Sequence, residues 1–147
     1  VDGREPGRTG NAHPNIYPYD SFPTHTVPIF LAVGNDKQFT ILCEHLGEPQ
    51  LAHEERYARA GARSTNRAAL RERLVTLLDS HDGSVLAKQL MNLGVPCSPV
   101  LSVSAALNHP HTVHRDMVVK IGDSYTGVAS PIKLSRTPAT YRLAPPL

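Results

Sequence analysis

The segment Gly94–Val100, GVPCSPV, constrains the fold most, because a helix must end there and an extended segment must begin. Gly94 follows a run of helix-forming residues and can adopt the left-handed conformation that closes a helix. Pro96 and Pro99 cannot continue the helix, and each biases the preceding residue toward extended geometry. Cys97 lies between them. We expect it to be a buried structural residue rather than a nucleophile, since no His or Lys lies near it in the sequence to activate the thiol.

Apolar patterns predict a strand and then a helix in the first third of the chain. Pro28–Val33, PIFLAV, has the length and character of a short strand that starts at a proline. Asn35 can cap the next helix, and Gln38 can complete a capping box. Gly47 closes that helix. Its buried face, spaced by three and four residues, is expected to be Phe39, Leu42, Cys43 and Leu46.

Two longer helices and two strands are expected in the rest of the chain, besides a short, charged turn of helix at Glu54–Gly61 and a short helix after Ser102. One helix begins near Asn66 and ends near Ser80, and the next leads into Gly94. Met117–Ile121 and Val128–Leu134 are predicted strands, and Pro131 pushes the second toward a sheet edge. The inward-facing residues are predicted to be Leu70, Leu74, Leu77 and Leu78 in the first helix, and Leu86, Leu90 and Leu93 in the second.

The order of these elements indicates a small α+β domain, with an antiparallel sheet covered by helices on one face and extended N- and C-terminal arms. Prolines and glycines crowd the two ends, where they favour irregular chain. We place an N-terminal arm at residues 1–27, the domain at 28–134 and a C-terminal arm at 135–147. Apolar residues of the N-terminal arm need burial by this domain, a second domain or a second subunit. They are Ile16, Tyr17, Tyr19 and Phe22.

Composition limits the function class of the chain. A net charge of +2, no Trp and only three Phe argue against a nucleic-acid partner. No apolar run reaches the roughly 18 residues of a membrane span. Two cysteines without C-x-x-C spacing favour a reducing compartment, so we expect a cytoplasmic protein. The first eleven residues, VDGREPGRTGN, resemble an internal segment, so we expect the chain to be part of a longer protein.

A row of arginines is the most prominent charged feature. Glu54, Glu55 and Glu72 are interleaved with it, which favours a solvated, salt-bridged face over an anion site. The arginines are Arg56, Arg59, Arg63, Arg67, Arg71 and Arg73.

Three histidines follow a short helix that Ser102 can cap. They are His109, His111 and His114, and three imidazoles could suggest a metal site. Only Asp116 could complete a ligand set, and Pro110 argues for a loop, so we expect an exposed loop and no metal.

Five segments resemble, in order, successive signatures of the class III CoA-transferases, which include formyl-CoA and carnitine CoA-transferases and α-methylacyl-CoA racemases. They span nearly the whole chain, which makes the resemblance far more specific than any single motif. The segments are GNAHPNIYPYDSF (Gly10–Phe22), LAVGNDKQF (Leu31–Phe39), GVPCSPV (Gly94–Val100), MVV (Met117–Val119) and ASPIKLSRTPATYRLAPPL (Ala129–Leu147).

The resemblance implies a piece of an enzyme: a linker, the small domain and the start of a return linker. Family members also have a Rossmann-like large domain, and two subunits interlock. Their nucleophilic aspartate and most CoA contacts would lie upstream of Val1, so we assign no catalytic residue here. The implied substrates are an acyl-CoA and a carboxylic acid, with coenzyme A as substrate and no other cofactor. A homodimer or an arm-exchanged oligomer is expected, without nucleic-acid or membrane partners.

One segment matches a functional loop of the family. Gly10, Asn11, His13, Pro14 and Asn15 occupy the place where formyl-CoA transferases have a glycine-rich loop that folds over the reacting acyl group. Such a lid would keep water from an aspartyl-CoA anhydride. Alternatively, these residues only turn the linker.

Two departures from the family pattern keep a second function open. Thr24–Val27 replaces an Ala-Asp-Gly turn, and Gly122–Gly127 replaces a longer strand pair. The leading hypothesis is the small-domain part of a class III CoA-transferase. The alternative is a stand-alone, non-catalytic binding or assembly module derived from that domain.

Overall fold

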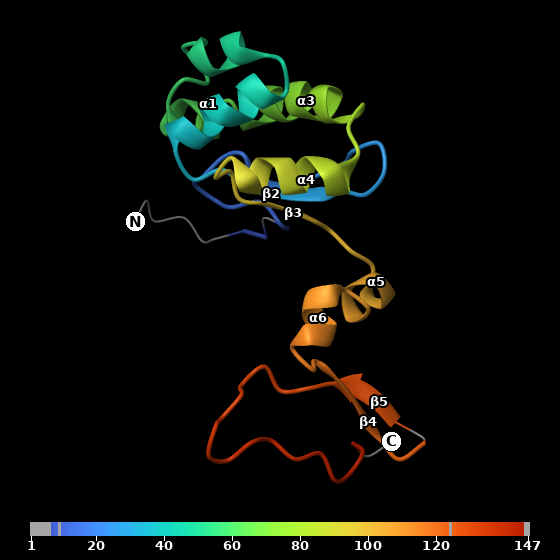
Figure 1. Ribbon diagram of the computed structural model, residues 1–147. Helices are drawn as coiled ribbons and strands as arrows, with labels where there is room; N and C mark the ends of the chain where they lie inside the picture. Colours follow the sequence, from blue (N-terminus) through green and yellow to red (C-terminus); the bar gives the residue numbers. More distant parts are fainter. Residues whose placement is uncertain (1–6, 9, 124, 146–147) are drawn as a thin grey trace. The chain divides into compact units, whose positions relative to one another are not determined.

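The computed structural model describes residues 7–8, 10–123 and 125–145. The chain forms two compact units, one ending at Val100 and the other beginning at Leu101 (Figure 1). Each unit contains helices and one small antiparallel sheet. The predicted α+β class is therefore confirmed.

A three-stranded antiparallel sheet forms the base of the first unit. Its strands are β1 (Tyr19–Phe22), β2 (Ile29–Ala32) and β3 (Cys97–Pro99), with β2 in the centre. Leu31 of β2 is paired with Asp20 on one side and with Cys97 on the other. In Figure 1 the helices α1 (Asp36–His45), α3 (Arg67–Leu78) and α4 (Gly83–Asn92) lie on one side of this sheet, as predicted.

Helix α1 begins and ends as its sequence predicts. The Asn35 side chain accepts a hydrogen bond from the Gln38 amide at 2.9 Å. The Gln38 side-chain oxygen accepts a hydrogen bond in return, although from the amide of Gly34 (2.8 Å) rather than from that of the cap itself. Gly47 closes the segment with φ +77°. The predicted face is buried at all four positions, Phe39, Leu42, Cys43 and Leu46.

The chain between α1 and α4 contains a 3₁₀ turn, η1 (Pro49–His53), and the short helix α2 (Ala60–Thr65) that leads into α3. Within the short turn of helix predicted at Glu54–Gly61, residues 54–59 form turns and bends, and the helix begins only at Ala60. Leu70, Leu74 and Leu78 are fully buried, whereas Leu77 packs on the core edge.

The break after α4 follows the prediction except at one residue. The Asp82 side chain caps α4 by accepting from the Val85 amide at 2.9 Å, and Gly94 adopts φ +82°. Leu93 was predicted to be buried but is 47% exposed, so that prediction is wrong. The left-handed turn at Gly94 redirects the chain, and Val95 fills the core position instead.

Residues 16–22 of the N-terminal arm are packed on the first unit. Tyr17 and Phe22 are buried in the main core, and Ile16 and Tyr19 are half-buried. Residues 19–22 also pair with β2 as an edge strand. Of the three partners considered for these side chains, this domain itself covers Tyr17 and Phe22, so burying them needs no second subunit.

The second unit consists of α5 (Val103–Leu107), α6 (Pro110–His114) and the hairpin of β4 (Val118–Ile121) and β5 (Tyr125–Val128). Ser102 caps α5 as predicted. The histidine segment was expected to be a loop, but it forms α6, because His109 caps the turn through the His111 amide and Pro110 suits a first helical position.

The predicted strand Val128–Leu134 is wrong in its position along the chain. The second strand of the hairpin ends at Val128, and residues 129–134 are irregular. Gly122 adopts φ +58° directly after β4, and Tyr125 at the start of β5 pairs with Ile121. Pro131 then has no amide hydrogen to contribute to a ladder. Ala129 is the one fully buried hydrophobic residue among those described in this unit.

Candidate functional site

The five residues matched to the family loop lie together in one turn near the middle of the N-terminal arm. Gly10 has φ +64°, a conformation that favours glycine. The His13 ring folds back over the turn, and its Nδ1 accepts hydrogen bonds from the Asn15 amide (3.1 Å) and the Ile16 amide (3.0 Å). Asn11, Pro14 and Asn15 are exposed. We call residues 10–16 the His13 turn.

Arg67 joins the His13 turn to the beginning of α3. Its guanidinium donates to the carbonyl oxygen of Pro14 at 2.7 Å and to that of His13 at 3.3 Å. The same group donates to the Ser64 carbonyl at 3.2 Å and to the Ser64 hydroxyl at 3.0 Å, and it lies over the Tyr17 ring. The charged side chain of Arg67 therefore ties the backbone of the turn to the helical layer.

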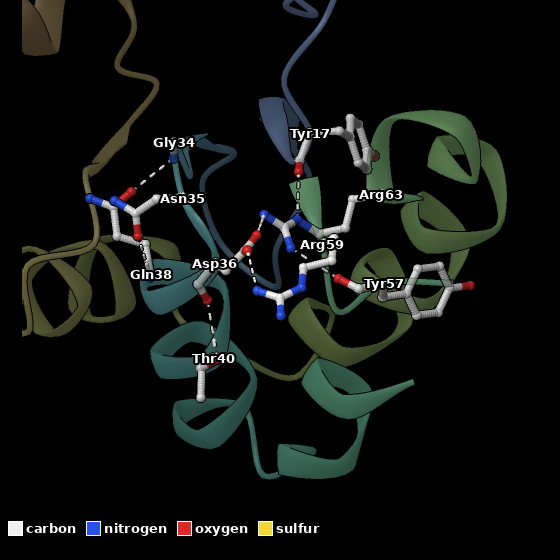
Figure 2. A network of polar contacts seen from close by, with 9 residues as sticks. All are labelled: Tyr17, Gly34, Asn35, Asp36, Gln38, Thr40, Tyr57, Arg59 and Arg63. Atoms are coloured by element: carbon white, nitrogen blue, oxygen red, sulfur yellow. Dashed lines mark hydrogen bonds and ion pairs between the residues drawn. The ribbon is translucent and has the colours of Figure 1, made fainter. Parts of the chain in front are cut away.

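Arg63 holds the next part of the arm from inside the core. Its guanidinium donates to the carbonyl oxygens of Tyr17 (3.0 Å) and Tyr57 (2.9 Å) and to the Asp36 carboxylate (2.9 Å) (Figure 2). The guanidinium also lies 4.6 Å from the centre of the Phe39 ring. Three segments that are distant in sequence thus meet at one buried cation.

Asp36 is the counter-ion of this centre. Partial burial would raise the pKa of the Asp36 carboxyl, but the hydrogen bond and charge of Arg63, together with Arg59, outweigh that effect and hold it below its ordinary value. The carboxylate stays partly exposed, so its contribution is weakened by solvent.

Arg71 holds the arm where it forms β1. It donates to the Asp20 carboxylate at 2.8 Å and to the Ser21 carbonyl at 3.1 Å, and it lies 5.0 Å from the centre of the Phe22 ring. Arg63, Arg67 and Arg71, which we call the arginine row, therefore bind successive segments of one arm.

The arginine row corrects the prediction of a solvated basic face. Arg63 is completely buried, and Arg67 and Arg71 are half-buried. A usable signal was present in the sequence: Arg63 and Arg67 precede Leu70 and Leu74 with spacings of four, three and four residues, which puts all four on one helical face. The exposed arginines follow the prediction: Arg56 and Arg73 pair with Glu54, Arg73 also pairs with Glu48, and Arg59 pairs with Asp36.

Two buried tyrosine hydroxyls flank the arginine row. Within the part of the chain that the structure describes, neither the Tyr17 nor the Tyr57 hydroxyl has a hydrogen-bond partner. Burial raises the pKa of the Tyr17 phenol, and the neighbouring Arg71 guanidinium only partly offsets this. Both rings therefore act as apolar packing surfaces.

The remaining reactive side chains lack the surroundings of a catalytic or metal centre. Cys43 and Cys97 are buried and unpaired, and burial raises the pKa of each thiol to about 12. A thiol with this pKa is a poor nucleophile at neutral pH. Among the described residues, no group of three or more His, Cys, Asp or Glu side chains could hold a metal ion. No described helix is both long and apolar enough to cross a membrane.

Comparison with known proteins assigns this chain to a family. The model of CoA-transferase family III matches residues 1–147. The chain is 36% identical over 150 residues to the succinate–glutarate CoA-transferase of Agrobacterium fabrum, covering 99% of this chain and 38% of that protein. It is 34% identical to the acetyl-CoA:oxalate CoA-transferase of Acetobacter aceti, covering 90% of this chain and 34% of that protein.

A solved structure gives the same result. The crystal structure of a CAIB/BAIF family protein from Brucella suis superposes with a TM-score of 0.84 at 35% identity, covering 93% of this chain and 36% of that one. The chain thus spans little more than a third of the length of these relatives. The match over all 147 residues nevertheless establishes that the chain belongs to CoA-transferase family III.

Proposed function

We propose that this chain is the linker and small-domain part of a class III CoA-transferase, with the arm at 1–27, the small domain at 28–134 and the start of a return linker at 135–147. The observation that carries the proposal is the collinear match of the entire chain to one part of the family. The reaction moves CoA from an acyl-CoA to a carboxylic acid. The enzyme would act as an interlocked homodimer in the cytoplasm.

The chemistry depends on a large domain outside these 147 residues. There, an aspartate carboxylate attacks the thioester carbonyl, which gives a mixed anhydride and the CoA thiolate. The thiolate then attacks the aspartyl carbonyl, releases the donor acid and leaves an aspartyl-CoA thioester. The acceptor carboxylate repeats the two steps in reverse order and leaves with CoA.

The part assigned to this chain is the exclusion of water. Each anhydride is destroyed if water reaches it before the thiolate or carboxylate does. We propose that the His13 turn, with Gly10, Asn11, His13, Pro14 and Asn15, is the lid over the acyl group. The exposed side chains of Asn11 and Asn15, and the backbone held by Arg67, support this assignment.

A chimeric enzyme tests the function. The aligned part of the Agrobacterium fabrum relative is replaced by this chain, and the passage of CoA between the two acids in the relative's name is followed by chromatography. We expect the chimera to transfer CoA and the isolated 147-residue chain to give no exchange above the uncatalysed rate. A soluble chimera that melts as cooperatively as the relative but transfers no CoA would favour the alternative, a non-catalytic binding or assembly module.

A further inference from the structure

We propose that Arg67 and His13 are positioning residues that hold the His13 turn in one fixed conformation. The inference deepens the proposed function, since it rests on the assignment of this turn as the lid. It concerns how the lid keeps its shape, and it does not require that either side chain touch the substrate.

The Arg67 guanidinium is oriented by contacts that lie outside the His13 turn. Ser64, one helical turn earlier, accepts from it through both its carbonyl and its hydroxyl oxygen, and the Tyr17 ring lies beneath it. The remaining donors then point at two consecutive carbonyl groups, those of His13 and Pro14. A planar fork of this kind fixes direction as well as distance, which a single ammonium group cannot do.

His13 organises the same turn from within. Its Nδ1 accepts two amide hydrogens, so this nitrogen must be unprotonated and any ring proton must lie on Nε2. Its own amide donates to the Tyr19 carbonyl at 2.9 Å, and its ring packs on the Tyr19 ring at a centroid distance of 5.2 Å. Tyr19 in turn meets Phe30 of β2 edge to face, which connects the turn to the centre of the sheet.

Both residues act on the backbone and leave the outer side chains of the turn free. Arg67 binds the turn from the neighbouring helix, and His13 binds it from within, whereas Asn11 and Asn15 remain exposed. A lid built in this way presents the same outer surface in each catalytic cycle, without an ordering cost on closure.

Amide hydrogen exchange in the full 147-residue chain tests the inference. Arg67→Ala and His13→Ala each remove one contact, and Arg67→Lys and His13→Asn are the conservative partners. The Asn side chain keeps an acceptor at the position of Nδ1, as in an ordinary Asx turn. Arg73→Ala is the matched control, since it removes an arginine of the same helix whose ion-pair partners among the described residues are Glu48 and Glu54.

We expect the Asn15 and Ile16 amides to exchange roughly three- to tenfold faster in both alanine variants, the factor that corresponds to one hydrogen bond of ordinary net strength. His13→Asn should restore most of the protection and Arg67→Lys part of it, and Arg73→Ala should leave it unchanged. The nitrogen spectrum of the wild-type imidazole should show the unprotonated Nδ1.

Unchanged exchange at Asn15 and Ile16 in both alanine variants would overturn the inference, and so would a proton on Nδ1. If Arg67→Ala also loosens the core, the His13→Ala and His13→Asn pair decides the matter, because the ring lies on the half-exposed turn. No CoA is present in this experiment. A failure here therefore leaves the proposed transferase function standing, and a failed chimera leaves this inference standing.

Discussion

Replacing Arg63 by alanine is expected to destabilise the first unit strongly. The change leaves the Tyr17 and Tyr57 carbonyls without a donor, because among the described residues no other group is hydrogen-bonded to them. A buried polar group left unpaired costs about 1–3 kcal/mol. The lost contact with the Phe39 ring adds roughly 1 kcal/mol. The Asp36 ion pair adds little, since that carboxylate is partly exposed.

The expected total is about 4 kcal/mol for Arg63→Ala, obtained from two unpaired carbonyls and the lost ring contact. With a urea dependence of about 2 kcal/mol per M, the midpoint should fall by about 2 M. Far-UV circular dichroism during urea unfolding measures it. Arg63→Lys should lie between wild type and alanine, because one ammonium group cannot reach three acceptors in different directions.

Arg59→Ala is the matched control for this change. Arg59 also pairs with Asp36, but at 3.5 Å and with a side chain that is 85% exposed. We expect its urea midpoint to match wild type. A midpoint of Arg63→Ala equal to that of Arg59→Ala would refute the view that a buried guanidinium joins the arm to the core.

Three further changes probe the same unit. Gly83→Ala should destabilise by about 1–3 kcal/mol although alanine favours helices, because the new methyl would meet the Val27 carbonyl; Gly61→Ala, with open space, should be neutral or slightly stabilising in thermal melts. The lowered pKa of Asp36 means that its stabilisation is present above the ordinary value of 3.8 and is lost as pH falls through the lowered one. The difference in urea midpoint between wild type and Asp36→Asn should therefore shrink at acidic pH, and a constant difference would contradict this. Cys97, with a pKa of about 12, should be alkylated slowly at neutral pH. Cys97→Ala should cost on the order of 1 kcal/mol, less than the roughly 1–3 kcal/mol of Gly94→Val at φ +82°. Fast alkylation together with a harmless Gly94→Val would make Cys97 a reactive site.

Features set by neighbouring residues could be predicted from the sequence. The cap at Asn35, the left-handed closure at Gly94 and the buried face of α1 all depend on contacts within a few positions along the chain. The His13 turn was identified only through the family resemblance, although its two side-chain bonds span just two and three residues.

Features that depend on distant segments were missed. Arg63 binds Tyr17, 46 residues away, and Asp36, 27 residues away, so its burial could not be inferred from the charges around it. The charge pattern favoured a solvated face, whereas the helical spacing with Leu70 and Leu74 favoured the core. Tertiary hydrogen bonds from an extended arm decided between them. The position of the last strand was predicted wrongly for a similar reason, because its pairing with β4 sets it.

The ratio of hydrolysis to transfer in the chimeric enzyme tests the central claim most directly, since it asks whether the arm and its arginine row serve CoA transfer. Free acid formed without an acceptor product measures hydrolysis, and acceptor acyl-CoA measures transfer. The account predicts that the ratio rises severalfold in Arg67→Ala and His13→Ala, returns toward wild type in His13→Asn and stays unchanged in Arg73→Ala. Equal ratios in all four variants, with the Asn15 and Ile16 amides loosened in the two alanine variants, would contradict it.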